Sequence, residues 1–380
     1  LTRITFPFLL FVSLSSFFAS ILTSNNKFAA TAAAPIILNI VLISSLIISY
    51  YLELDFSKQL SYGVTLAGLI QLLFLVYVTL KYYKPDLVLN LKVSRKVKLF
   101  FRKLLPSILS SGVTQINILV GTIIASFQPG AVSYLYYADR VYQINLAIAG
   151  IAVGTVSLPV LSKAFKTKDL KKMSNIQNKS FELSLLLSVP ASLGLILASE
   201  EIVTALFGYG SFSKDDVTLT AEALKYFGFG VPAFALVKIL SNFYFARDNT
   251  KTPFYISMFI VTLNILISVS FFSKIGFIII PIATSISTWI GVLIYLYLLN
   301  LKKALLLKNQ LIFNFIKILV STILMSFVLL FALDSYANYL EYFYKYKAIY
   351  LISIVSFVGI LYLLSCYLLG ILKLKNYKTN

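Results

Sequence analysis

An acidic and a basic residue, Asp139 and Arg140, are adjacent within a long apolar segment that begins near Val132. If this segment is a helix with a rise of about 1.5 Å per residue, the pair lies roughly 12 Å from its start. That depth is close to the middle of a bilayer core about 30 Å thick. A charged side chain there costs on the order of 2.5–3.5 kcal/mol unless it faces a partner or a watery cavity. We therefore predict that the pair belongs to a polar substrate path through a membrane.

A structural role for the same two residues is the alternative. The opposite charges could neutralise each other, or Arg140 could reach toward the membrane surface and hold two helices together. Neighbouring residues on a helix do not face each other well, because they point about 100° apart. The spacing therefore favours a functional role for Arg140 and leaves both interpretations open for Asp139.

The residue types that are absent limit the chemistry further. The chain has no histidine, which excludes histidine-based metal sites, Ser–His catalytic triads and histidine proton relays. Its single cysteine, Cys366, lies in the last apolar segment, so no intrachain disulfide can form. No loop has the acidic or metal-binding set that a membrane glycosyltransferase needs. We predict a transporter rather than an enzyme, without a cofactor.

The composition indicates an integral membrane protein. Of the 380 residues, 59% are hydrophobic and 12% are charged, whereas soluble domains average about 25% charged residues. The net charge of +19 does not indicate a nucleic-acid partner, because the basic residues lie between apolar segments of spanning length. We interpret them as signals that orient the chain in the membrane.

We predict an all-α integral membrane fold with eleven transmembrane helices. The expected spans are residues 4–23, 28–52, 60–80, 104–127, 132–162, 175–199, 217–246, 253–273, 275–301, 311–333 and 348–372. Residues 200–216 are expected to form an interfacial turn. Summed over alternate connections, one side carries 23 basic and 3 acidic residues, and the other carries 6 and 8. The positive-inside rule then predicts a cytoplasmic C-terminus.

An internal repeat suggests how the helices are grouped. Residues 6–40 align with 231–265 without gaps, so that Pro7 meets Pro232 and Asn39 meets Asn264. Parallel repeats of this kind are typical of two-lobed transporters with a site between the halves. The alignment places the first helix on the seventh, so we expect three preceding helices to be missing. The lack of an initial Met and of a signal peptide agrees with that expectation.

These patterns predict four parts of the chain. Residues 1–82 form the second half of an N-terminal lobe, 83–103 a basic cytoplasmic linker, 104–303 a six-helix C-terminal lobe, and 304–380 two additional helices. Within the linker, residues 92–103 (KVSRKVKLFFRK) could lie on the anionic membrane surface or could simply be a charged loop.

Some polar and small residues within the apolar segments are expected to have defined contacts. Asn117 could line a cavity or hydrogen-bond a neighbouring helix, and both possibilities stay open. Gly150 and Gly154 form a small-xxx-small pair that is expected to pack closely against another helix. Lys238 lies deep in the seventh span, and its side chain is expected to extend toward the membrane surface.

Four stretches of the sequence resemble one family. They are residues 4–43 (beginning ITFPFLLFVSLSS), 136–165 (YYADRVYQINLAIAGIAVGTVSLPVLSKAF), 207–216 (FGYGSFSKDD) and 245–253 (FARDNTKTP). They resemble the MurJ (MviN) lipid II flippases of the multidrug/oligosaccharidyl-lipid/polysaccharide exporter superfamily, over most of residues 1–305. The resemblance implies a fourteen-helix, two-lobe transporter fold, of which this chain would carry eleven helices. It also implies that lipid II, a lipid-linked peptidoglycan precursor, is flipped across the bacterial cytoplasmic membrane by alternating access.

The resemblance also implies which residues bind the substrate. The central Asp-Arg pair of the family falls on Asp139 and Arg140, an acidic position falls on Gln143, and a basic position in the thirteenth family helix falls on Lys317. Arg140 is expected to attract the diphosphate, since its guanidinium is a permanently charged fork of donors. Asn117 completes the predicted substrate site. The family's essential arginines in its first two helices have no counterpart, so this chain alone is not expected to be a working flippase.

The expected partners are lipid II or a similar polyprenyl-diphosphate lipid and the surrounding membrane lipids, with no nucleic acid, and the chain is expected to be a monomer. Transport could be coupled to the membrane potential or to a monovalent cation, for which Asp139 is the expected titrating group. Two alternatives stay open. One is a flippase for another polyprenyl-linked polysaccharide, and the other is a cation or drug exporter, which would need a cavity dominated by carboxylates.

Overall fold

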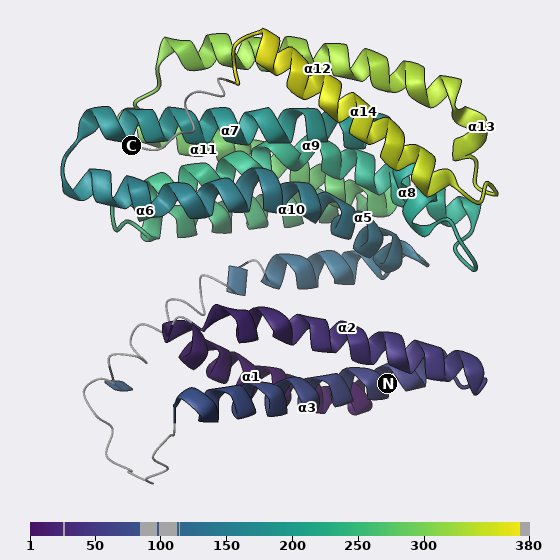
Figure 1. Ribbon diagram of the computed structural model, residues 1–380. Coiled ribbons are helices and arrows are strands. Elements are labelled where there is room, and N and C mark those ends of the chain that lie inside the picture. Colours follow the sequence, from purple (N-terminus) through teal and green to yellow (C-terminus); the bar gives the residue numbers. More distant parts are fainter. Residues whose placement is uncertain (26, 84–96, 99–111, 114, 373–380) are drawn as a thin grey trace. The chain divides into compact units, whose positions relative to one another are not determined.

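The computed structural model describes residues 1–25, 27–83, 97–98, 112–113 and 115–372 (Figure 1). These residues form helices joined by short connections, with no strand among them. The chain separates into two compact units, Leu1–Lys98 and Leu99–Asn380, which we call unit 1 and unit 2. The four finer parts predicted from the sequence stay predictions.

Unit 1 contains three long helices, α1 (Thr2–Ser24), α2 (Phe28–Tyr51) and α3 (Phe56–Tyr82). The carboxylate of Asp55 caps the start of α3 by accepting hydrogen bonds from two backbone N–H groups. Helix α3 packs against both α1 and α2. Two of its side chains also donate to backbone carbonyls of these helices, Thr65 to Ile4 at 2.5 Å and Gln71 to Ala34 at 2.7 Å. Polar contacts therefore hold a mainly apolar three-helix unit together.

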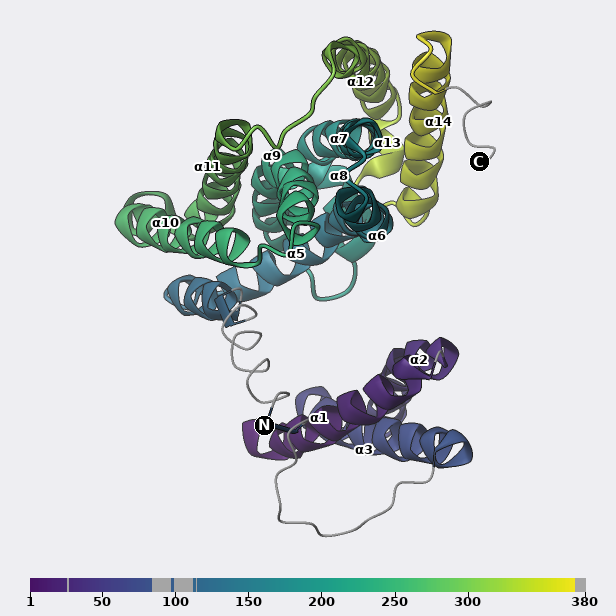
Figure 2. The same ribbon diagram turned by 90° about the vertical axis from the view of Figure 1, so that its left-hand side faces the viewer.

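Unit 2 contains α5 (Ala131–Leu146), a π-helical turn (Ala147–Ala152), α6 (Val153–Lys166), α7 (Leu170–Leu197), α8 (Ser199–Phe207), α9 (Lys214–Phe245), α10 (Lys251–Ile275), α11 (Ile279–Leu301), α12 (Asn309–Ser335), α13 (Ala337–Leu340) and α14 (Lys347–Leu368). The helical segment Gln115–Ala125 precedes them. Helix α9 packs against α5, α6, α7, α8 and α11 and is the most buried candidate span (Figure 2). Helices α12 and α14 pack against each other, and α12 also packs against α7.

The observed helices agree with the predicted spans to within a few residues. In the described part of the chain, nine helical segments are long and apolar enough to cross a membrane, and one of them, Lys251–Leu301, contains both α10 and α11. These two are separated at Gly276, where φ is 74°, a conformation that favours glycine. The predicted fourth span and the predicted basic linker lie largely outside the described residues. The total of eleven helices and the three missing ones stay predictions.

The predicted repeat extends to helix packing within each unit. In unit 1, α3 packs extensively against α1 and α2, which contact each other less. In unit 2, α11 packs extensively against α9 and α10, which also contact each other less. Pro7 and Pro232, matched by the sequence alignment, lie inside α1 and α9. The two three-helix groups thus share an internal packing order.

Close packing of Gly150 and Gly154 is confirmed. A Cβ atom added to Gly150 would lie 3.1 Å from the Cα atom of Ala235, and one added to Gly154 would lie 3.1 Å from Nδ2 of Asn242. The same Asn242 amide donates a hydrogen bond to the Gly154 carbonyl at 2.8 Å. The π-helical turn lies between α5 and α6 at this contact with α9. Such turns are frequent at functional sites.

The interfacial turn predicted for residues 200–216 is wrong in its first half, because this half belongs to helix α8. Val203 and Ala205 are buried, so the short helix covers part of the core. Glu200 and Glu201 lie in its first turn, where negative charge complements the helix dipole. The two acidic residues of this half therefore stabilise the start of a helix.

Two amide side chains of α7 attach the connection between α11 and α12. The Gln177 side chain donates to the Ala304 carbonyl at 3.1 Å and accepts from the Leu306 N–H at 2.9 Å. Asn178 makes the equivalent pair with the Leu306 carbonyl and the Lys308 N–H, both at 2.8 Å. These bonds satisfy backbone groups that would otherwise be buried without partners. They hold the connection to the last two long helices in a defined path.

Replacing Gln177 by Leu should lower the free energy of unfolding by about 1–3 kcal/mol, because the Leu306 N–H loses its partner and the Ala304 carbonyl loses one of its two donors. Unfolding by SDS in mixed micelles would measure this change. Asn175→Ala is the matched control on α7. Asn175 is exposed and accepts a hydrogen bond from the Lys308 ammonium, so the control should change stability by less than about 0.5 kcal/mol. Equal effects of the two substitutions would contradict this role of Gln177.

Candidate functional site

A cavity of about 1210 Å³ lies within unit 2, between the Gln115–Ala125 segment, α5, the π-helical turn, α9, α10 and α11. Its lining residues on α9 run from Phe227 to Phe245, which is about 27 Å along a helix axis. Those on α10 run from Lys251 to Ser268. The cavity is therefore nearly as long as a bilayer core is thick, about 30 Å.

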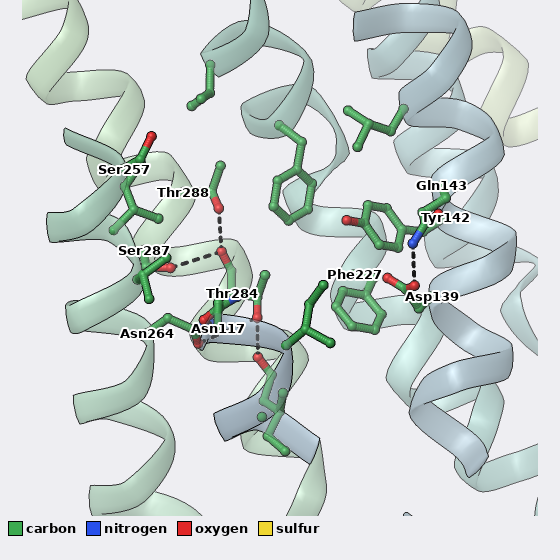
Figure 3. A pocket seen from close by; sticks show the side chains of 18 of the residues that line it. Asn117, Asp139, Tyr142, Gln143, Phe227, Ser257, Asn264, Thr284, Ser287 and Thr288 are labelled. Atoms are coloured by element: carbon green, nitrogen blue, oxygen red, sulfur yellow. Dashed lines mark hydrogen bonds between the residues drawn. The ribbon is translucent and has the colours of Figure 1, made fainter. Parts of the chain in front are cut away.

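One wall of the cavity is a cluster of amides and hydroxyls. The Asn264 amide of α10 donates to the Asn117 Oδ1 atom at 2.8 Å. The Asn264 Oδ1 atom accepts from the Ser268 hydroxyl at 3.3 Å and the Thr284 hydroxyl at 3.5 Å. Figure 3 shows Asn117, Asn264 and Thr284 gathered on one side of the cavity. Asn117 thus both lines the cavity and bonds a neighbouring helix, whereas its contact with substrate stays a prediction.

Asp139 and Gln143 of α5 lie on the other side of the cavity (Figure 3). They are one helical turn apart, and the Gln143 amide donates a hydrogen bond to the Asp139 carboxylate. A carboxylate at position 143 would be a second negative charge facing Asp139, whereas the neutral amide stabilises the first. Between them along the chain, Tyr142 stacks on Phe227 of α9, with ring centroids 4.9 Å apart. This stack fixes α5 against α9 at the level of the site.

Arg140 points differently from Asp139. Its guanidinium donates to the Tyr136 hydroxyl at 3.0 Å and lies over the same ring, 4.7 Å from the centroid. Arg140 is exposed and does not line the cavity, although Tyr136 does. The two adjacent residues project in different directions because of helical geometry. The structure therefore brings Asp139, Gln143 and Asn117 to one cavity and places Arg140 beside its wall.

Lys317 of α12 is not brought to this cavity. Its ammonium donates to the carbonyl of Leu369, the C-cap residue of α14, at 2.8 Å. A cation at this end of a helix satisfies a free carbonyl and complements the helix dipole. The observed contact is therefore structural, and substrate binding by Lys317 stays a prediction.

Sequence reasoning missed two basic residues of the site. Lys238 of α9 and Lys251, the first residue of α10, both line the cavity. Phe234, Lys238 and Phe245 line it from one face of α9, at a spacing that repeats every three to four residues. This spacing was a usable signal, but the depth of Lys238 alone suggested a side chain that extends toward the membrane surface.

The cavity has an uneven charge distribution. Its charged lining residues are Asp139 and the two lysines, Lys238 and Lys251. In the described part of the chain, no group of three acidic, cysteine or histidine side chains could hold a metal ion. The remaining polar surface consists of neutral amides and hydroxyls. Such a cavity can hydrogen-bond a polar headgroup and attract an anion at its lysines.

The stretch 245–253 forms a compact turn beside the lysine end of the cavity. The Asn249 side chain donates to the Thr252 hydroxyl at 3.0 Å and accepts from the Thr252 N–H at 3.1 Å. Arg247 donates to the Ala304 carbonyl at 2.9 Å, and burial lowers the pKa of its guanidinium. The turn therefore fixes the end of α9 relative to the start of α10, and with it the positions of Lys238 and Lys251.

The stretch 207–216 is a structural anchor at the start of α9. Ser213 and Asp216 form a capping box that begins this helix. The Asp216 carboxylate also accepts a hydrogen bond from the Tyr134 hydroxyl of α5 at 2.9 Å. Two elements that line the cavity are thereby tied together near their first residues.

Comparison with solved structures defines the class of protein. The chain matches a structure described as the "inward-facing conformation of a multidrug resistance MATE family transporter of the MOP superfamily", with a TM-score of 0.68 and 14% identity, over 80% of this chain and 71% of that chain. Identity at this level shows a shared fold alone. The shared helical fold and the nine long apolar helical segments of the described residues place this protein among multi-pass membrane proteins.

The chain belongs to the lipid II flippase MurJ family, whose model matches residues 1–351. It is 38% identical to the probable lipid II flippase MurJ of Rickettsia prowazekii, over 94% of this chain and 69% of that protein. It is 36% identical to that of Rhizobium tropici, over 77% of this chain, and spans 55% of the length of that relative. A solved structure described as "Lipid II flippase MurJ, inward closed conformation" matches with a TM-score of 0.77 and 27% identity, over 96% of this chain and 72% of that chain. The family predicted from the sequence is confirmed.

The Asn117–Asn264 bond should be measurable as a coupling between α10 and the Gln115–Ala125 segment. A double-mutant cycle of Asn117→Ala and Asn264→Ala should give a coupling energy of about 0.6–1.7 kcal/mol in the free energy of unfolding. Gln115→Ala is the matched control, because Gln115 is exposed and does not line the cavity. It should be additive with Asn264→Ala. Additivity of the Asn117 and Asn264 substitutions would show that the bond contributes nothing.

Proposed function

We propose that this protein flips lipid II, a polyprenyl-diphosphate precursor of peptidoglycan, across the bacterial cytoplasmic membrane. The observation that carries this proposal is a polar cavity of membrane length in a member of the lipid II flippase MurJ family. A lipid headgroup made of sugars, peptide and diphosphate needs hydrogen-bonding groups along its whole path, because an unsatisfied polar group in hydrocarbon is costly. The polyprenyl tail stays in the lipid.

The cavity walls support separate contacts with separate parts of the headgroup. The amide and hydroxyl cluster around Asn264 offers both donors and acceptors, which suits sugar hydroxyls and peptide groups. Asp139 and Gln143 offer a carboxylate and an amide on the other side. Alternating access exposes these groups first to one side of the membrane and then to the other.

Arg140 is the proposed diphosphate ligand at the Asp139 end. Its guanidinium bonds to the hydroxyl of Tyr136, and Tyr136 lines the cavity. A change of the Arg140 rotamer would move its guanidinium away from the Tyr136 ring. The planar N–H donors of the guanidinium could then bind phosphate oxygens. Tyr136 then acts as the resting partner of the guanidinium in the absence of substrate.

Further parts of the proposal concern the environment of the protein. It acts as a monomer among membrane lipids with its C-terminus in the cytoplasm, as the basic connections favour. The membrane potential or a monovalent cation drives the cycle, with Asp139 as the titrating group. Lys317 is a second candidate substrate contact. A flippase for another polyprenyl-linked polysaccharide would use the same diphosphate chemistry.

An exporter of cations or drugs is less well supported. Such a cavity is expected to be dominated by carboxylates, which attract a cationic substrate. The cavity of unit 2 is lined by one carboxylate, Asp139, and by two lysines, Lys238 and Lys251. This balance favours an anionic substrate.

Arg140→Ala should abolish rescue of a bacterium depleted of its own lipid II flippase by a gene that encodes this chain together with the three preceding helices expected from the repeat. Removing a charged hydrogen-bonding group from the phosphate should reduce export about tenfold or more. Accumulation of lipid II in the outer leaflet is the measurement. Lys171→Ala is the matched control, because Lys171 is an exposed cation of α7 that does not line the cavity. Full export by the Arg140→Ala protein would contradict the role of Arg140, and failure of the completed, otherwise unaltered chain to export lipid II would contradict the function.

A further inference from the structure

Lys238 and Lys251 both line the part of the cavity that lies toward the turn between α9 and α10. Lys238 lies seven residues before the last residue of α9, which is about 10 Å along the helix axis. On α9, the lining residues after Lys238 are Ser241 and Phe245, the last residue of the helix. On α10, the lining begins with Lys251 and the preceding Thr250. The turn between α9 and α10 joins these two helix ends directly. Two lysines therefore line the part of one cavity that lies nearest this turn.

Neither ammonium group has a partner among the described residues. The side chains of Lys238 and Lys251 form no ion pair, hydrogen bond or ring contact there. Asp248 is close in sequence but is exposed in the turn and does not line the cavity. Cations within or at the ends of spanning helices usually pair with an acid or serve a ligand. The described residues of unit 2 supply no acid to either lysine, so the geometry of this unit leaves room for a ligand.

The acid of the cavity is too distant to neutralise these lysines. Tyr142 of α5 stacks on Phe227 of α9 at 4.9 Å. Asp139 is three residues before Tyr142, and Lys238 is eleven residues after Phe227. Fourteen residues along parallel helices correspond to about 20 Å, which exceeds the Debye length of roughly 8 Å at physiological ionic strength. The lysine end and the Asp139 end are therefore electrostatically separate.

The surroundings of the lysines suit phosphate oxygens. Hydroxyl groups of Ser241 and Ser257 line the cavity in the same region of α9 and α10. Lys251 is the first residue of α10, a helix of 25 residues whose Thr252 N–H is bonded to the Asn249 side chain. The positive end of the helix dipole at this start favours anions. Two cations, two hydroxyl groups and a helix start thus lie in the same part of the cavity.

We propose that Lys238 and Lys251 form a phosphate-binding site that holds the diphosphate of a polyprenyl-linked lipid. This proposal rests on the proposed function and adds a second anion-binding site to it. The second site lies about 20 Å along the cavity from Asp139. The headgroup then crosses in two steps, with its diphosphate held by the lysine pair at one end and released to the Arg140 end at the other. The compact ammonium groups of flexible lysine side chains suit a binding site that must also release its ligand.

Binding to the purified full chain in lipid nanodiscs tests the site. The probes are farnesyl diphosphate, neutral farnesol and inorganic pyrophosphate. Lys238→Gln and Lys251→Gln should each weaken farnesyl diphosphate binding about tenfold or more. Neither should change farnesol binding, and Lys238→Arg should retain most of the affinity. Thermal unfolding of each variant verifies that the fold is intact.

The matched control is Lys225→Gln, because Lys225 is an exposed lysine on the same helix that does not line the cavity. It should bind farnesyl diphosphate like the unaltered protein. Unchanged affinity in both cavity variants, or an equal loss in the Lys225 variant, would overturn the site. Equally tight binding of inorganic pyrophosphate would overturn its assignment to a lipid headgroup.

The same experiment separates this site from the proposed function. Lysine-dependent binding by a chain that exports no lipid II would support the phosphate site and contradict the assigned function. Export of lipid II by a chain whose diphosphate binding is independent of both lysines would support the function and overturn the site.

Discussion

The structure depends on one constraint: a polar group placed within a membrane must find its partner inside the protein or at a water-filled cavity. Unit 2 meets this constraint in both ways. Asn242 bonds the Gly154 carbonyl where two helices touch, whereas Asn264 and Asn117 bond each other at the cavity wall. The same rule makes the lysines informative, because Lys317 and Arg140 have partners and Lys238 and Lys251 have none in the described part of the chain.

Helix α9 is the element against which the other helices of unit 2 and the cavity are arranged. It is the most buried span and contacts α5, α6, α7, α8 and α11. One face of α9 lines the cavity, from Phe227 to Phe245, while Gly150 of the π-helical turn packs tightly against another part of it at Ala235. A glycine is needed at that contact because a larger side chain would meet backbone. Tight packing of the π-helical turn therefore holds α9 beside the cavity.

Much of the fold could be predicted from the sequence, and less of the site. Spans were predictable because about twenty apolar residues are needed to cross a bilayer core. Gly150 and Gly154 were predictable because small residues at this spacing serve close packing. The first half of 200–216 was mistaken for a turn, since its acidic residues also suit the first turn of α8. Asp139 and Asn117 were recognised as polar groups at depth, whereas Lys238 was not recognised as a lining residue.

The sequence by itself determined that the protein is an all-helical membrane transporter of the MurJ family, because span length, charge bias and local motifs are properties of consecutive residues. Only the tertiary structure decided which side chains share a cavity. Asp139 and Arg140 are adjacent in sequence yet project in different directions, while Asn117 and Asn264 are distant in sequence yet form a hydrogen bond of 2.8 Å. Lys317 bonds the end of α14 and Lys238 faces the cavity. The physical reason is that hydrophobicity determines whether a segment enters the membrane, but helix rotation and packing determine where each of its polar side chains points.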